Sequence, residues 1–253
     1  MIPTLFHLGP IPIHSFGLMM VCSFLTAWKL LYMRLENAGE NPLMAERLIT
    51  WAAFGGILGA RIGYLISFPS ELMARPIETI FGGAGFVFHW GFVGGFLACW
   101  ILVKKEKGNF LKFADLSAPS LALGYAIGRI GCQLSGDGDY GKLSDLPWAI
   151  GYPLGVVPTP VGVAVHPTPI YETIICCIIA IILTNNKVSK LFNGYGKLFC
   201  FYLILVGLER FFVEILRIEP IVFSIFTQAQ VMSMGLIAIG TVLMFMLPKA
   251  REV

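Results

Sequence analysis

Residues 121–141 read LALGYAIGRIGCQLSGDGDYG, and they join an apolar run to a segment that does not suit lipid. The apolar part ends at Ile127, and Arg129 follows two residues later. A charged side chain at the centre of a bilayer costs roughly 2.5–3.5 kcal/mol on insertion scales. Irregular, glycine-rich backbone is tolerated at that depth only where it is buried in protein or lines a wet cavity. We therefore predict that residues 128–141 form the wall of a functional site and that the rest of the chain is its scaffold.

The composition around this stretch predicts an all-α, polytopic integral membrane protein. Of the 253 residues, 57% are hydrophobic and 13% are charged, whereas an average soluble domain carries about 25% charged residues. Apolar runs of about 20 residues recur along the whole length. About seven transmembrane helices are expected, at residues 15–35, 47–68, 88–103, 116–134, 169–184, 198–216 and 228–247. We expect one membrane-embedded domain over residues 1–253, with a loop rich in Gly and Pro at residues 136–168.

The placement of Lys and Arg predicts the orientation of these helices. One set of loop ends carries twelve of the 18 basic residues, namely Lys29, Arg34, Arg47, Lys104, Lys105, Lys107, Lys112, Lys187, Lys190, Lys197, Lys249 and Arg251. By the positive-inside rule this set is cytoplasmic, which puts the N-terminus outside and the C-terminus in the cytoplasm. The other six are Arg61, Arg75, Arg129, Lys142, Arg210 and Arg217. Several of these lie in or beside apolar runs, which indicates a site that opens to the outer face.

Other classes of partner and ligand are not indicated. No run of Lys and Arg with interleaved aromatic residues occurs, so a nucleic-acid partner is not expected. The six cysteines lie in or beside apolar runs, which is typical of small buried hydrophobic residues and not of a metal site. We expect no metal and no cofactor. Small residues in the second run, at Gly55, Gly59 and Gly63, are expected to let another helix approach closely.

Arg129 is a candidate for binding an anion, and a later helix carries a charged face. The planar, permanently charged fork of Arg129 suits a phosphate, although a structural ion pair with Asp137 or Glu214 is the alternative. Arg210 and Glu214 stand four residues apart and share a helix face, with Arg217 one turn beyond. From the residues alone, these three form a ladder of charges along one helix, which would orient the helices.

Ordered blocks along almost the whole chain resemble the prolipoprotein diacylglyceryl transferase family. The blocks are LGPIPIHSFGLM (8–19), GARIGYL (59–65), FHWGFVGG (88–95), GRIGCQLSGDGDYG (128–141), HPTPIYE (166–172) and LERFFVEILR (208–217). The resemblance implies a transferase that moves the diacylglyceryl group of phosphatidylglycerol to the lipobox cysteine thiol of a prolipoprotein signal peptide. A thioether forms and glycerol phosphate leaves.

The resemblance also implies a place and partners for this reaction. The enzyme would sit among the lipids of the bacterial inner membrane, with its active site toward the periplasm. Two other functions stay open at this point. One is a non-catalytic, lipid-binding paralogue of the same fold, and the other is a membrane transporter with buried charges along a path.

Family positions can be carried over to this chain residue by residue. The residues implied to be catalytic are His89, Arg129 and Arg210, and those implied at the phosphatidylglycerol head group are Arg129, Arg210, Gly141, Arg61 and His14. The residues implied to support them are Asp137, Asp139, Glu214, Glu172, Cys132 and Gln133. His89 could equally cap its helix, and Arg61 could instead make hydrogen bonds between helices. The signature acid aligns with Asp137, but one extra residue before Gly141 leaves Asp139 as the other choice.

Two positions depart from the family pattern. Phe16 stands where the family has Tyr, so a hydroxyl is missing. Cys132 stands where the family has Asn, and the adjacent Gln133 is the candidate replacement for that amide.

Overall fold

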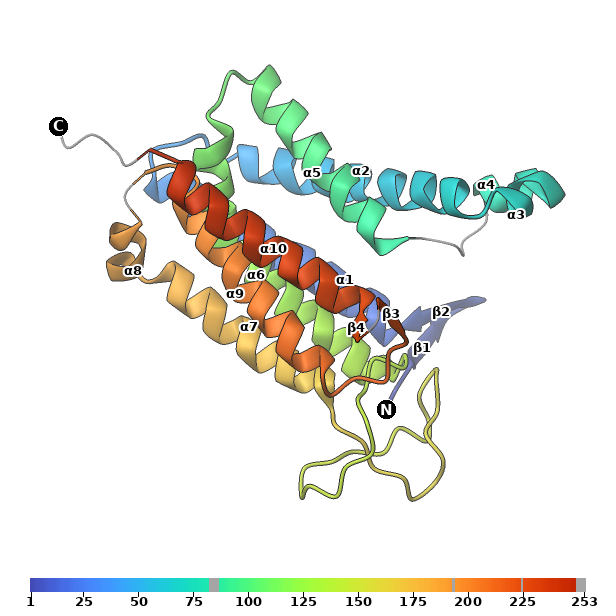
Figure 1. Cartoon of the computed structure of the whole chain (residues 1–253). Helices are drawn as coiled ribbons and strands as arrows, with labels where there is room; N and C mark the ends of the chain where they lie inside the picture. Colours follow the sequence, from blue (N-terminus) through green and yellow to red (C-terminus); the bar gives the residue numbers. More distant parts are fainter. Residues whose placement is uncertain (82–86, 193, 224, 249–253) are drawn as a thin grey trace. The chain divides into compact units, whose positions relative to one another are not determined.

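The computed structural model describes residues 1–81, 87–192, 194–223 and 225–248. In these ranges seven helices have 17 or more residues, and each overlaps one of the predicted apolar runs (Figure 1). They are α1 (Ser15–Asn37), α2 (Met44–Ser67), α5 (Phe88–Lys105), α6 (Phe110–Ser135), α7 (Thr168–Thr184), α9 (Lys197–Glu214) and α10 (Gln228–Met246). The helical class is therefore confirmed.

Three of the helices are long and apolar enough to cross a membrane. These are α1, α2 and α10, and the 17-residue α7 is a shorter apolar helix. This agrees with an all-α membrane protein. The count of seven spans and their orientation stay predictions, and Lys249 and Arg251, two of the charges used for the orientation, lie outside the described residues.

Short elements occupy the polar connections. Residues 1–14 form a hairpin of β1 (Thr4–Leu8) and β2 (Ile11–His14), in which Leu8 pairs with Ile11 around the turn. The connection after α2 contains α3 (Pro69–Ala74) and α4 (Pro76–Phe81), and its residues 82–86 lie outside the described part of the chain. The remaining elements are α8 (Asn186–Leu191), β3 (Ile221–Phe223) and β4 (Phe226–Thr227).

The chain divides into two compact units, each described here by itself. The first comprises Met1–Leu31 and Ala114–Val253, and the second comprises Tyr32–Phe113. The single domain expected from sequence stays a prediction.

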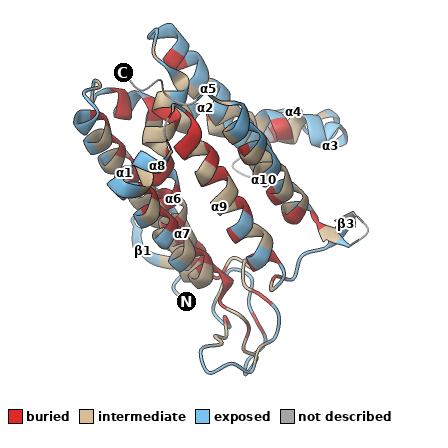
Figure 2. Ribbon diagram, turned by 60° about the vertical axis from the view of Figure 1, so that its left-hand side comes forward, coloured by how far each residue is buried: buried red, intermediate tan, exposed pale blue. Residues whose placement is uncertain are grey.

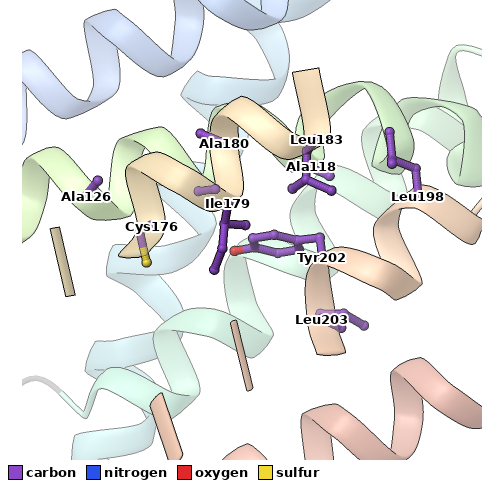
Figure 3. Packing of buried hydrophobic residues seen from close by; sticks show 10 residues of the cluster. Ala118, Ala126, Cys176, Ile179, Ala180, Leu183, Leu198, Tyr202 and Leu203 are labelled. Carbon is purple, nitrogen blue, oxygen red and sulfur yellow. The ribbon is translucent and has the colours of Figure 1, made fainter. Parts of the chain in front are cut away.

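The first unit has an apolar core where α6, α7 and α9 meet. Small residues of α6 recur every fourth position, at Ala118, Ala122 and Ala126, and these admit the side chains of the other two helices. Figure 3 shows Tyr202 of α9 extending toward Ile179 and Cys176 of α7. Buried residues also run along α9 in Figure 2. The three helices are thus held together by apolar packing at the level of residues 118–126.

The second unit is built on a close glycine contact between α2 and α5. A Cβ atom added to Gly59 would lie 2.9 Å from the Cα atom of Gly94, and one added to Gly55 would lie 2.6 Å from the Gly94 carbonyl oxygen. Contacts this short exclude any side chain, so only glycine permits the approach. The prediction from small residues in the second run is confirmed.

Candidate active site

Arg129 lies near the end of α6 and is held on several sides by anionic and polar groups. Its guanidinium group pairs with Asp139 and makes two contacts with Glu172, Nε to Oε2 at 2.7 Å and Nη2 to Oε1 at 2.8 Å. Only 12% of the Arg129 side chain is exposed. The ion pair expected as the structural alternative had Asp137 or Glu214 as the partner of Arg129. The structure selects Asp139 and Glu172, the latter from a helix 43 residues further along the chain.

Tyr125 provides a hydroxyl group one helical turn before Arg129. The hydroxyl accepts a hydrogen bond from Arg129 Nε at 3.2 Å and lies 3.1 Å from Glu172 Oε1, to which it donates. The Arg129 guanidinium carbon also lies 5.2 Å from the centre of the Tyr125 ring. Sequence analysis missed this residue, although its spacing of four from Arg129 on one helix was a usable signal.

Glu172 in α7 joins the two arginines that the family resemblance singled out. Its side chain is fully buried, and Oε1 accepts a hydrogen bond from Arg210 Nη1 at 2.6 Å in addition to the contacts with Arg129. A buried carboxylate is tolerated when its charge is paired and its oxygens are hydrogen-bonded. Two guanidinium forks from α6 and α9 therefore converge on one anionic group.

Arg210, Glu214 and Arg217 form the predicted charged face at the end of α9. Arg210 Nη2 lies 2.9 Å from Glu214 Oε2, and Arg217 Nε lies 3.4 Å from the same oxygen. The other oxygen, Glu214 Oε1, accepts a hydrogen bond from the Thr227 hydroxyl at 2.8 Å. Thr227 also caps α10, because its hydroxyl accepts a hydrogen bond from the backbone N–H of Gln230. Glu214 thus connects two arginines to the start of the last helix.

Asp139 closes the cluster from the loop that follows α6. It pairs with Arg129 and, at 2.6 Å, with Nη2 of Arg217. Burial alone would raise the pKa of the Asp139 carboxyl, but the two guanidinium groups outweigh burial and lower its pKa below the usual value. The Asp137 carboxylate instead accepts a hydrogen bond from the Asp139 backbone N–H at 3.3 Å. Of the two acids left open by sequence, Asp139 is the one that contacts the arginines. We call the group of Arg129, Arg210, Arg217, Asp139, Glu172 and Glu214 the arginine cluster.

Gly141 lies where the loop after α6 touches the ends of two other segments. Its backbone N–H donates to the His166 carbonyl at 2.8 Å, and a Cβ atom added to it would lie 2.5 Å from the Leu216 carbonyl oxygen and 2.9 Å from His166 Cβ. A side chain would force these backbones apart. The glycine is therefore explained by close backbone approach, which places Asp139 next to Arg217.

The two departures from the family pattern have local structural counterparts. The Cys132 thiol lies 3.4 Å from Arg129 Nη1, so sulfur occupies a position beside the guanidinium group. Gln133 does not replace the missing amide in this structure, because its Oε1 accepts a hydrogen bond from the Tyr152 hydroxyl at 2.8 Å. Burial raises the pKa of Tyr152 to about 12, so this hydroxyl stays a donor. The Phe16 ring packs where a Cβ atom on Gly131 would lie, 3.2 Å away.

Three other predicted site residues belong to the N-terminal hairpin and to the second unit. His14 is exposed, and its Nδ1 lies 3.3 Å from the Thr4 hydroxyl across the hairpin. Arg61 and His89 belong to the second unit, at one end of the α2–α5 pair, where the Val87 N–H donates to the Ala60 carbonyl. Their part in the site stays a prediction.

One acid of a candidate cation site is already paired with arginines. Ligand atoms of Cys132, Asp137 and Asp139 lie within 4.8 Å of one another, a spacing that could hold a metal ion. Both oxygens of Asp139 are, however, already engaged by arginines. Three guanidinium groups meet four paired carboxylates, since Glu219 also lies 2.9 Å from Arg217 Nη2, and parts of the Arg129 and Arg210 side chains (12% and 23%) remain exposed. Guanidinium groups are well suited to bind phosphate.

Comparison with known proteins places the chain beside one group of enzymes. The sequence matches the family model described as prolipoprotein diacylglyceryl transferase over residues 3–246. A phosphatidylglycerol–prolipoprotein diacylglyceryl transferase of Solidesulfovibrio magneticus is 30% identical over 249 residues, covering 94% of this chain and 91% of the relative. The Legionella pneumophila protein of that name is 32% identical, covering 94% of both chains. The Clostridium tetani protein is 33% identical, covering 86% of both.

Proposed function

The chain belongs to the prolipoprotein diacylglyceryl transferase family, and on that premise we propose how its arginine cluster serves the transfer reaction. The chain is a transferase that moves the diacylglyceryl group from phosphatidylglycerol to prolipoprotein. The acceptor in our proposal is the thiol of the lipobox cysteine. The sulfur forms a bond with the glyceryl carbon, the bond from that carbon to the phosphate oxygen breaks, and glycerol phosphate leaves.

The observation that carries the proposal is the double engagement of Glu172 by Arg129 and Arg210, at 2.6–2.8 Å. Two guanidinium forks that converge on one buried anion are already aligned for an anionic group. The phosphate of phosphatidylglycerol carries its charge on two oxygens and would be received by the same two guanidinium groups. Negative charge that builds on the leaving phosphate would then be stabilised by groups that need no reorganisation.

The other family positions take supporting roles in this proposal. Gly141 fixes the loop that carries Asp139, and Asp139 orients Arg129 and Arg217. Glu214 and Glu172 hold Arg210. The base that receives the thiol proton is assigned to His89 because a neutral imidazole can accept a proton near neutral pH.

The membrane setting follows from the same family and from charge placement. We assign the protein to the bacterial inner membrane, with seven spans, the N-terminus outside and the arginine cluster toward the periplasmic face. Cysteine substitutions at exposed loop positions, tested with a membrane-impermeant thiol reagent, measure this orientation. Labelling of residue 145 from the outside is expected, and labelling of residue 187 from that side contradicts the assignment.

The transfer reaction is tested with membranes that contain the protein, phosphatidylglycerol and a lipobox peptide. A gain in the mass of the peptide by one diacylglyceryl group is expected. The same gene is expected to rescue cells depleted of their own transferase. Absence of both, under conditions in which a relative such as the Legionella pneumophila enzyme is active, contradicts the proposal and favours a lipid-binding paralogue.

A further inference from the structure

A third buried carboxyl group, besides those of Glu172 and Glu214, lies beside the arginine cluster and has no place in the proposal above. Glu209 precedes Arg210 in α9 and is 4% exposed. Neither of its carboxylate oxygens has a hydrogen-bond partner among the described residues. This differs from Glu172, Glu214 and Asp139, each of which is paired with at least two arginines or hydroxyl groups.

The surroundings of Glu209 come from three helices of the first unit. It interacts electrostatically with Glu172 of α7, with Arg210 of its own helix and with Arg129 of α6.

The interactions of Glu209 extend to weaker acids of the same three helices. They are Tyr125 on α6, Cys176 on α7 and Tyr202 on α9. Figure 3 shows Cys176 and Tyr202 facing the space between α7 and α9. Glu209 therefore lies between the apolar core and the arginine cluster.

The guanidinium groups of the cluster already have their counter-charges without Glu209. Three guanidinium groups face the paired carboxylates of Asp139, Glu172 and Glu214, and the partly exposed Glu219 also lies 2.9 Å from Arg217 Nη2. An ionised carboxylate that is buried without a partner costs several kcal/mol, whereas the neutral acid avoids this cost. A charged Glu209 would also repel Glu172 and compete with it for Arg210. The resting site is thus consistent only with a protonated Glu209.

We propose that Glu209 is a positioning residue whose proton is required for phosphate binding, so that its ionisation releases the lipid head group from Arg129 and Arg210. This inference rests on the proposed function. The physical reason is charge: the incoming phosphate adds one negative charge to arginines that carboxylates already match, and an ionised Glu209 would add a second at short range. Proton binding at Glu209 and phosphate binding at the arginines are then coupled, and each favours the other.

The test measures binding of a short-chain phosphatidylglycerol to the purified full-length protein in detergent, without peptide, from neutral to alkaline pH. Omitting the peptide removes the ionisation of the acceptor thiol from the readout. Binding by the parent protein is expected to weaken by about fivefold or more across the range, the scale of ordinary coupling between sites. Glu209→Gln keeps the shape of a neutral acid, so it is expected to bind as the parent does at neutral pH and to lose most of this pH dependence.

Glu46→Gln, which replaces an exposed glutamate of α2, is the matched control and is expected to keep the parent's pH dependence. A second, independent measurement is the infrared band of a neutral carboxylic acid. This band is expected in the parent at neutral pH, and it is expected to be absent in Glu209→Gln and in Glu209→Leu. The parent and either folded variant suffice for this comparison.

Unchanged pH dependence in Glu209→Gln, or a neutral-acid band that survives in both variants, overturns the inference. Neither result touches the proposed function, which depends on transfer activity and on its loss in Arg129→Ala. Loss of transfer in the parent itself would contradict the proposed function, while the infrared band still reports on Glu209.

Discussion

The same three helices, α6, α7 and α9, pack in two different ways along their length. Between Ala118 and Ala126 they meet through alanine, leucine and isoleucine side chains without any ion pair among the core residues. From Arg129 onward they meet through guanidinium and carboxylate groups at 2.6–2.9 Å. Apolar packing thus holds the helices at one end of this bundle. The charged end needs another explanation, since buried ion pairs contribute little net stability over apolar residues of similar size.

Comparing the two ends separates residues that stabilise the fold from residues that serve the reaction. The largest expected effect is a loss of transfer activity when the charged end is changed. Arg129→Ala removes the fork that faces the phosphate, and we expect transfer to fall by about 10²–10³-fold or more, as for loss of one charge-stabilising donor. Arg129→Lys keeps the charge but not the planar fork and is expected to recover only a small part. Transfer to a lipobox peptide, normalised to folded protein, measures this. Near-normal transfer in Arg129→Ala would show that the cluster is only structural.

At the apolar end the expected change is in stability alone. Leu183 is fully buried in the core of the first unit, and Leu183→Ala should lower the free energy of unfolding by about 2–5 kcal/mol. Transfer per folded molecule should stay close to that of the parent. Leu191→Ala, at a 78% exposed position of α8, is the size-matched control and should change neither quantity. A large loss of transfer in folded Leu183→Ala would mean that the two ends are not separable.

The contribution of Asp139 to stability is expected to depend on pH. Because its pKa is lowered in the folded protein, the ionised carboxylate stabilises the fold above its unfolded pKa of about 3.9 and loses this effect as the pH falls further. Asp139→Asn is expected to cost about 1.5–3 kcal/mol at neutral pH, and the difference from the parent should shrink only in strong acid. Thermal unfolding at several pH values measures it. Asp137→Asn is the matched control, and an equal cost there would point to the wrong acid.

The smallest effect is expected at Cys132. Its thiol is a weak acceptor 3.4 Å from Arg129 Nη1, so Cys132→Ala should change transfer by no more than about 1 kcal/mol in barrier, roughly fivefold. Cys132→Asn introduces the amide that the family has at this position and should leave transfer within the same range. A loss as deep as that of Arg129→Ala would place the thiol in the reaction itself.

The sequence alone predicted where the long helices lie and named most of the charged residues that form the arginine cluster. Hydrophobic runs located all seven long helices, because burying or spanning apolar length is a local property of the chain. The hairpin of residues 1–14 was not predicted. Its turn at Gly9, where φ is +62°, depends on backbone geometry that a hydrophobic pattern does not specify.

The pairing within the cluster could not be predicted, because partners such as Arg217 and Asp139 are 78 residues apart. Alignment by residue type favoured Asp137, whereas the contact of Gly141 with the Leu216 backbone brings Asp139 to the arginines. Glu209 was overlooked although a carboxyl group inside an apolar helix is itself a signal of function. The order of acidic residues along the chain does not indicate that Glu209 would lack a hydrogen-bond partner.

The shared hydroxyl of Thr227 has a consequence for how the protein is made. This single group both starts α10 and donates to Glu214 at the end of α9. The chain is made from its N-terminus, so α6, α7 and α9 leave the ribosome ahead of α10. Until Thr227 is in place, Glu214 lacks one of its partners. The charged end is therefore completed only when the last helix packs against α9.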